Sequence, residues 1–117
     1  MKTLTTSLFI LAAGLVSLPA VAAGDIAAGK AVAEKHNCAS CHGKDYRTAI
    51  DPTYPKLAGQ HADYLRQALI EYRRGGTGPN GRANAIMNGM AKPLSDQDIL
   101  DVAAYLHSLP GNLVLRK

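Results

Sequence analysis

The spacing of apolar residues along the chain predicts three helices. Small and apolar residues recur every three or four positions over 26–36, 62–74 and 95–109, the period of one helix face. No segment alternates with the period of two that a half-buried strand shows. The recurring positions are Ile26, Gly29, Val32, Ala33 and His36; Ala62, Leu65, Leu69 and Tyr72; and Ile99, Val102, Ala103, Leu106 and Leu109. The pattern therefore predicts an all-α fold.

Residues that start and stop helices mark the ends of these segments. Asp25 is placed to cap the first helix. Ser95, with Asp98 three residues on, forms a capping box in which Asp replaces the usual Glu. The expected stops are Asn37, Gly75–Gly76 and Pro110–Gly111. Between the last two long helices, residues 82–88 are expected to form a short helix ended by Gly89.

Gly29 lies in the middle of the first predicted helix. Glycine there costs about 1 kcal/mol relative to alanine. Because Ala33 shares its stripe, we expect another helix to cross closely at Gly29. On the second helix the polar residues are expected to face solvent; they include Asp63, Arg66, Gln67, Glu71 and Arg73.

The long connection over residues 43–60 contains Gly43, Pro52, Pro55 and Gly59 and shows no clear period. Loops of this length without regular structure are usually functional or wrapped around something. We therefore expect an ordered loop here.

The first 22 residues have the features of a cleaved secretory signal. Lys2 is positive, Leu8–Val16 is apolar, and Ala20-Val21-Ala22 is a small-residue cleavage site. The apolar run is shorter than the ~20 residues of a membrane span, so an uncleaved anchor is the less favoured alternative. The predicted organisation is a signal peptide over 1–22 and a single domain over 23–117, without a membrane span once the signal is removed. The tail from Asn112 is expected to be loose.

Composition indicates a thin core. The chain has five Tyr, one Phe and no Trp, and the Phe is in the signal. A domain of about 95 residues is marginally stable alone, so a large apolar cofactor would help to complete its core. The net charge is +4, but the sequence has no run of Lys and Arg with interleaved aromatic residues. This argues against nucleic-acid binding.

The residues Cys38-Ala39-Ser40-Cys41-His42 carry the chemistry. They read Cys-x-x-Cys-His, the attachment signature of a c-type haem, in which two thiols form thioethers to the vinyl groups and the histidine binds the iron. Three alternatives are weaker. A thioredoxin-like motif needs a preceding strand, zinc needs a second ligand pair, and a disulfide across two residues would do little structural work.

The other axial iron ligand is expected from the region around Met87 and Met90. Their neighbours Asn88, Gly89, Lys92 and Pro93 are not typical of a hydrophobic core, which favours an iron-ligand role for one of the two methionines. Spacing alone does not choose between them. Ligation through His61 is the minority alternative, and His36, His61 and His107 are otherwise expected to be solvated.

With these motifs the chain resembles a class I c-type cytochrome, most closely the cytochrome c4 and small c553 type of the bacterial periplasm. The resemblance covers nearly all of the chain after the signal. The residues that carry it are Ala28-Gly29-Lys30, Cys38 to Gly43, Tyr54 to Gln60, Tyr64-Leu65, Met87, Leu94 to Ile99 and Ala104 to Leu106.

The resemblance implies a small cytochrome c fold, with about four helices around one covalently attached haem. It implies Met87 as the axial ligand by register, with Met90 as the fallback. It also implies that the Pro55 carbonyl accepts a hydrogen bond from His42, and that Gly29 packs against Tyr105. Cytochromes c4 carry two haem domains, whereas this chain has one motif, so a single-haem relative is expected.

The sequence thus predicts a periplasmic single-haem electron carrier that docks transiently with other redox proteins and is not an enzyme. Lys44, Lys56 and Lys92 are candidates to flank an exposed haem edge, although lysines that only solvate the surface are as good an explanation. A haem sensor or peroxidase-like protein with an open sixth site, and a haem subunit of a larger oxidoreductase, are the alternatives.

Overall fold

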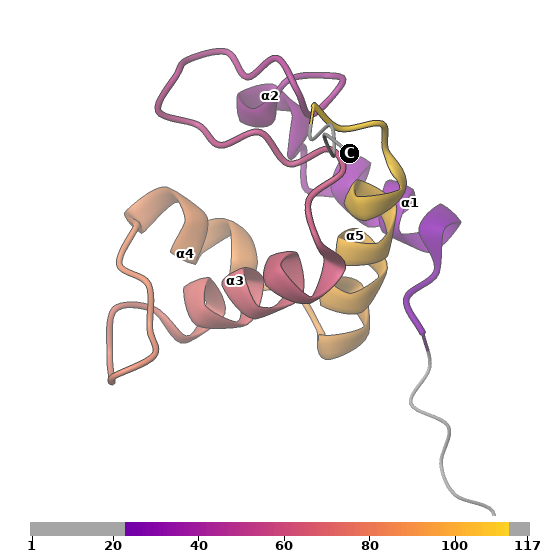
Figure 1. The fold of residues 1–117 in the computed structure, drawn as a ribbon. Helices are drawn as coiled ribbons and strands as arrows, with labels where there is room; N and C mark the ends of the chain where they lie inside the picture. Colours follow the sequence, from indigo (N-terminus) through magenta and orange to yellow (C-terminus); the bar gives the residue numbers. More distant parts are fainter. Residues whose placement is uncertain (1–22, 113–117) are drawn as a thin grey trace, which may run out of the picture.

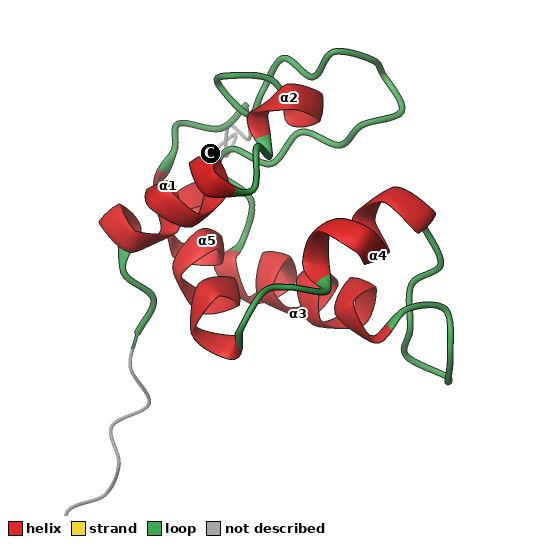
Figure 2. Ribbon diagram, turned by 180° about the vertical axis from the view of Figure 1, so that it is seen from behind, coloured by secondary structure: helices red, strands yellow, loops and turns green. Residues whose placement is uncertain are grey.

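The computed structural model describes residues 23–112, and within that range it contains five helices and no strand. The helices are α1 (Ile26–Lys35), α2 (Ala39–His42), α3 (Ala62–Arg74), α4 (Ala85–Ala91) and α5 (Asp96–Ser108), arranged as Figures 1 and 2 show. The predicted all-α class is confirmed. The predicted signal peptide (1–22) and residues 113–117 of the tail lie outside the described residues. None of the helices described is both long and apolar enough to cross a bilayer.

α1 crosses α5 at Gly29. A Cβ added at Gly29 would lie 1.9 Å from the carbonyl oxygen of Asp101 and 2.8 Å from the Cβ of Tyr105. Only glycine therefore allows the two helices to approach this closely. The crossing expected from the sequence is confirmed, as is the contact with Tyr105 that the resemblance implied.

A buried carboxylate fastens the start of α1 to α5. Asp101 is 6% exposed. Its Oδ1 accepts hydrogen bonds from the Asp25 backbone N–H and from the Gln97 side-chain amide, each at 2.8 Å. Asp25 in turn caps α1 by accepting from the Ala28 N–H at 2.7 Å. The cap was predicted, but the Asp101 contact was not, because it joins residues far apart in the sequence.

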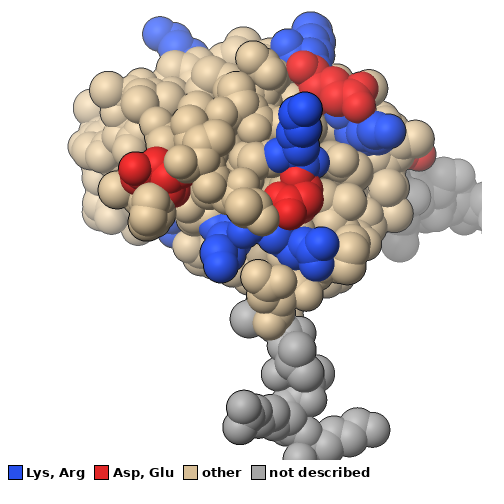
Figure 3. Space-filling view, turned by 90° about the horizontal axis from the view of Figure 1, so that it is seen from above, with Lys and Arg blue, Asp and Glu red and all other residues tan. Residues whose placement is uncertain are grey.

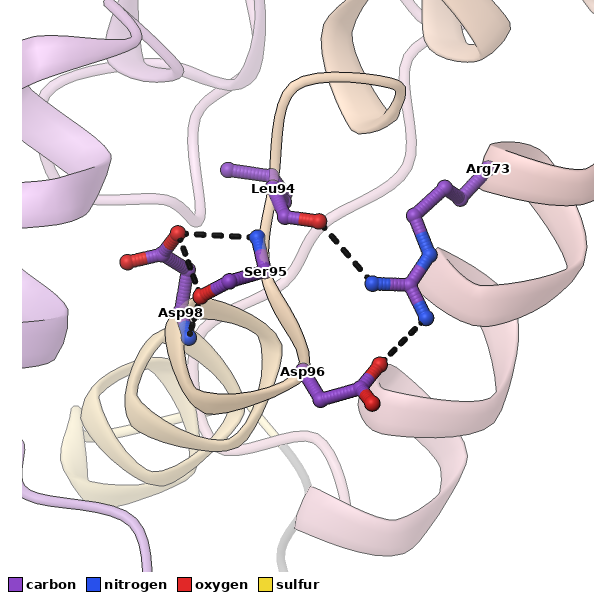
Figure 4. A network of polar contacts seen from close by, with 5 residues as sticks. All are labelled: Arg73, Leu94, Ser95, Asp96 and Asp98. Atoms are coloured by element: carbon purple, nitrogen blue, oxygen red, sulfur yellow. Dashed lines mark hydrogen bonds and ion pairs between the residues drawn. The ribbon is translucent and has the colours of Figure 1, made fainter.

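The start of α5 carries the predicted capping box. The Asp98 N–H donates to Ser95 Oγ at 3.1 Å, and the Ser95 N–H donates to Asp98 Oδ2 at 2.9 Å (Figure 4). Beside the box, Arg73 reaches across from α3 to donate to the Leu94 carbonyl at 2.9 Å and to pair with Asp96. Arg73 was expected to face solvent; instead it links α3 to α5.

The packed core is made of aliphatic side chains and one tyrosine. Tyr46 is 3% exposed, and its carbonyl accepts from the N–H groups of Leu57 and Ala58 at 2.8 and 3.0 Å. These bonds fold the loop that follows α2 back on itself, so the expected order of this loop is confirmed. The core cluster comprises Ala33, Tyr46, Ala58, Leu65, Val102, Ala103 and Leu106.

The bounds predicted for the short fourth helix are wrong. α4 starts at Ala85, because the Asn84 side chain caps it by accepting from the Met87 N–H at 2.9 Å. Gly89 does not end the helix but lies inside it, and a Cβ there would meet nothing within 4 Å. The helix ends at Ala91, shortly before Pro93, which cannot continue it.

Candidate functional site

The Cys-x-x-Cys-His segment folds as one helical turn. Cys38 stands at the N-terminal end of α2, and its carbonyl oxygen accepts from the N–H groups of Cys41 at 3.4 Å and His42 at 3.2 Å. Both cysteines are free thiols and partly exposed, and burial raises the pKa of the Cys38 thiol. This turn brings two thiols and an imidazole together, as haem attachment requires.

Gly43 ends this turn in a left-handed conformation with a φ of +85°. A Cβ at this position would lie 2.0 Å from the Thr48 carbonyl oxygen. The chain then folds back toward the motif, and the Ile50 N–H donates to the Cys41 carbonyl at 3.2 Å. The following loop is therefore fixed against the back of the motif.

His42 is buried and has a defined tautomer. It is 6% exposed, and its Nδ1 lies 2.8 Å from the Pro55 carbonyl oxygen. A carbonyl only accepts, so Nδ1 carries the hydrogen and Nε2 keeps its lone pair for a metal. The Tyr54 ring packs edge-on against the imidazole, with 6.1 Å between centroids. The contact with Pro55 that the resemblance implied is therefore present.

The donors present fit a metal supplied within a porphyrin. Among residues 23–112, no group of three or more His, Cys, Asp or Glu side chains could hold a metal ion. The site offers one oriented imidazole beside two free thiols, which suits covalent attachment of a porphyrin and a bond from the imidazole to its iron. His42, Cys38 and Cys41 are the residues that would hold the group.

Met87 and Met90 both lie in α4 and are partly buried. Residues three apart are neighbours on a helix surface, so the two thioethers share one side of α4. α4 packs on α3 and lies below α2 and its loop in Figure 1. The helix thus presents both candidates together.

The other histidines have local roles. His61 is exposed at the N-terminal end of α3, and His36 follows α1 as its C-cap. His107 is exposed, with its Nδ1 2.9 Å from the Gln60 carbonyl oxygen. The solvated character expected of His61 and His107 is confirmed, and His36 is partly buried.

Sequence reasoning missed a cluster around Arg82. The Arg82 Nε donates to Glu71 Oε2 at 2.6 Å, and the guanidinium carbon lies 5.5 Å from the ring centroids of both Tyr64 and Tyr72. Glu71 was expected to face solvent, but its side chain is 19% exposed. The bond from Arg82, and then one from Gln67, lower the pKa of Glu71. An Arg that follows several glycines gives no periodic signal, which is why the pattern did not reveal the cluster.

Charge is unevenly spread over the side of the domain that carries α2 and its loop. Figure 3 looks onto that side: Lys and Arg alternate with acidic residues over one part, and a broad part carries little charge. Lys44, Lys56 and Lys92, the candidates to flank a docking surface, are all exposed.

Comparison with known proteins agrees with this geometry. The family model described as "Cytochrome c" matches residues 26–110. Cytochrome c-554(548) of Halomonas halodenitrificans is 44% identical over 86 residues, which cover 74% of this chain and 98% of that protein. Cytochrome c4 of Stutzerimonas stutzeri is 40% identical over 108 residues, covering 89% of this chain and 50% of that protein.

A solved structure shows the same fold. Reduced recombinant cytochrome c4 from Pseudomonas stutzeri superimposes with a TM-score of 0.67 at 40% identity, over 78% of this chain and 48% of that one. The chain thus spans about half the length of the cytochromes c4 that it matches. The predicted cytochrome c fold is confirmed, and the predicted electron-transfer role agrees with these relatives. On its motif, its helical fold and these matches, the chain belongs to the cytochrome c family.

Proposed function

We propose that this chain is a periplasmic, single-haem c-type cytochrome that passes single electrons between redox proteins. Cys38 and Cys41 would hold the haem through thioethers, and His42 and Met87 would be the axial ligands of its iron, with Met90 as the fallback. When bound, the haem supplies a one-electron ferric–ferrous couple. The protein itself makes no bond in a substrate and is not an enzyme.

The observation that carries this proposal is the hydrogen bond between His42 and Pro55. The bond, 2.8 Å long, leaves Nε2 as the only nitrogen of the ring with a lone pair to donate. It also orients the imidazole and increases its basicity as a ligand. The histidine is also buried, and both cysteines next to it are free to form thioethers.

The methionine would complete a low-spin site. With His42 and a methionine both bound, the iron would have two strong ligands from the protein, so little would reorganise when an electron is transferred. A thioether ligand and an apolar surround raise the reduction potential. Small, weak interfaces suit this kind of encounter, which agrees with transient docking at a mixed, sparsely charged surface.

Methionine variants test the ligand assignment. The mature protein, made in a host with haem-attachment machinery, should show the ferric iron–sulfur charge-transfer band. Met87→Ala should abolish the band, and Met90→Ala, the matched control on the same helix, should keep it. Loss in Met90→Ala alone would move the assignment to Met90. A wild-type protein without the band would reject methionine ligation.

Mass spectrometry tests the haem count and the export signal. The periplasmic product should have the mass of residues 23–117 or 24–117 plus one haem that stays bound under denaturing conditions. Cys38→Ser should retain only one thioether and an altered ferrous spectrum. A product without covalent haem, or with residues 1–22 still present, would contradict the proposal.

A further inference from the structure

We propose that Arg82, together with Glu71 and Asn88, is a positioning group that holds α4 so that its methionine stays on the iron. The inference rests on the methionine ligation proposed above. It concerns how firmly that bond is kept, which neither the motif nor the family assignment specifies.

The Arg82 side chain is fixed by contacts with α3. Its Nε donates to Glu71 Oε2 at 2.6 Å, and its guanidinium lies against two tyrosine rings of α3, 5.5 Å from each centroid. The Arg82 backbone N–H also donates to the Glu71 carbonyl at 3.3 Å. Gln67 gives Glu71 a further hydrogen bond at 3.1 Å. Both the side chain and the backbone of Arg82 are thus hydrogen-bonded to Glu71, and the guanidinium also contacts two further residues of α3.

Asn88 connects this point to α4. Its side-chain amide donates to the Arg82 carbonyl at 2.8 Å and to the Tyr72 carbonyl at 2.6 Å. Its Oδ1 accepts from the Asn84 N–H at 2.9 Å. Asn88 lies directly after Met87 in the chain, so the network reaches from α3 to the residue beside the proposed ligand.

α4 needs such a network because few other contacts hold its N-terminal half. It has seven residues, too few for a helix to be stable in water without tertiary contacts. Of the helices described, only α3 makes extensive contact with it, and Ile86 on its outer side is 57% exposed. The segment that leads into it, residues 75–84, contains Gly75, Gly76, Gly78 and Gly81. The C-terminal end of α4 is held by buried Ala91 and by the Arg73 bond to the Leu94 carbonyl just after the helix. The N-terminal half, which carries Met87, depends on the Arg82 cluster, so weakening the cluster would let this half and its methionine move away from α3.

Imidazole binding to the ferric protein measures this directly. Imidazole reaches the iron only when the methionine has left, so its apparent affinity is proportional to the fraction of protein in the detached state. Arg82→Lys keeps the charge but loses the planar guanidinium that contacts Glu71 and both rings. We expect imidazole to bind Arg82→Lys about tenfold more tightly than the wild type, the loss expected for a charged hydrogen bond.

A milder variant and a matched control complete the experiment. Glu71→Gln keeps the shape but removes the charge, and should raise imidazole affinity by about threefold. Arg66→Ala removes an exposed arginine of α3, the helix that carries Glu71, and should leave the imidazole affinity unchanged.

Two outcomes would overturn the inference in different ways. If the wild type shows the iron–sulfur band but imidazole binds both cluster variants as it binds Arg66→Ala, the positioning role is wrong, even if the variants melt at lower temperature. If the wild type lacks the band, the proposed methionine ligation fails and the positioning role falls with it.

Discussion

His42 is oriented by a bond to the main chain, not to a side chain. The acceptor is the Pro55 carbonyl, which lies in a loop anchored through Tyr46 and closed against the motif at Gly43. Since a backbone acceptor cannot be deleted by mutation, the residues that hold the loop in place decide whether the ring keeps its tautomer. Two of them give predictions at the scale of single residues.

Asp45 should make part of the protein's stability depend on acid pH. Its carboxylate accepts from the N–H groups of Arg47 and Thr48, at 2.9 and 2.7 Å, and from the Thr48 hydroxyl at 2.9 Å. The backbone bonds from Thr48 and Arg47 lower the pKa of Asp45 to about 2. Because the folded pKa lies below the unfolded value, this contribution is full above about pH 4 and is lost as pH falls toward 2.

Thermal unfolding measured against pH checks this. Asp45→Asn should melt at a lower temperature than the wild type at pH 6, and the two melting curves should converge between about pH 4 and pH 2. A constant difference at all pH values would mean that the ionised carboxylate is not the stabilising form.

Gly43→Ala should destabilise the protein by more than about 1 kcal/mol. The residue has a φ of +85°, and a Cβ would lie 2.0 Å from the Thr48 carbonyl oxygen. Gly78 has a φ of +90° with nothing within 4 Å of an added Cβ, so Gly78→Ala isolates the cost of the backbone conformation alone. Urea unfolding of the two variants should rank Gly43→Ala as clearly the less stable. Equal midpoints would show that the loop does not close on the motif.

At the scale of helices, replacing glycine by alanine should have opposite effects on stability at two places: where α1 crosses α5, and inside α4. Gly29→Ala places a Cβ 1.9 Å from the Asp101 carbonyl oxygen and should push the helices apart. Gly89→Ala lies inside α4 with open space around it and should stabilise by about 0.5–1 kcal/mol, the helix preference for alanine. Denaturant unfolding of both variants measures whether each substitution lowers or raises the free energy of unfolding.

The outcome for Gly89 also tests where α4 ends. The sequence alone suggested that Gly89 ends the helix. A glycine that ends a helix commonly adopts a left-handed conformation, in which alanine would be destabilising. A loss of stability in Gly89→Ala would therefore contradict the continuous helix from Ala85 to Ala91.

Local signals explain which elements the sequence predicted well. Asp25 and Ser95 cap their helices through neighbours three residues on, and the apolar stripe of α5 repeats over its whole length, so these elements could be predicted correctly. α4 has no such stripe, and its start depends on the Asn84 side chain, so its bounds were misplaced.

The contacts of Glu71, Arg73 and Asp101 could not be predicted from the sequence. Each looks like an ordinary charged residue of a helix, and each has its partner outside its own helix: Arg82, Asp96 and Asp25. For His42, an acceptor in the loop of residues 43–60 could be expected from the chemistry of a metal-binding histidine, but only the resemblance to a known family singled out Pro55. The motif itself was readable because all its parts lie within five consecutive residues.

At the scale of the whole molecule, the core is too thin to explain the fold without the haem. Apart from Tyr46, the buried cluster consists of Ala, Leu and Val, and the helices that would flank the haem, α2 and α4, have four and seven residues. A porphyrin would supply the missing apolar surface between them.

The haem-free protein should therefore be largely unfolded. The double variant Cys38→Ser, Cys41→Ser, after solvent extraction of any bound haem, should lose most of its helical far-ultraviolet circular dichroism at 25 °C and show no cooperative melt. The wild-type holoprotein is the reference. A haem-free chain with the helical signal and cooperative unfolding of the holoprotein would show that the protein core is sufficient.

The most direct test of the electron-carrier account is the optical spectrum of the ferrous protein before and after addition of carbon monoxide. A protein that only carries electrons needs both axial positions filled by its own residues, His42 and one methionine of α4. We predict a low-spin spectrum that carbon monoxide leaves unchanged. A high-spin spectrum, or prompt carbon monoxide binding, would show an open iron site and would favour a sensor or a peroxidase-like protein.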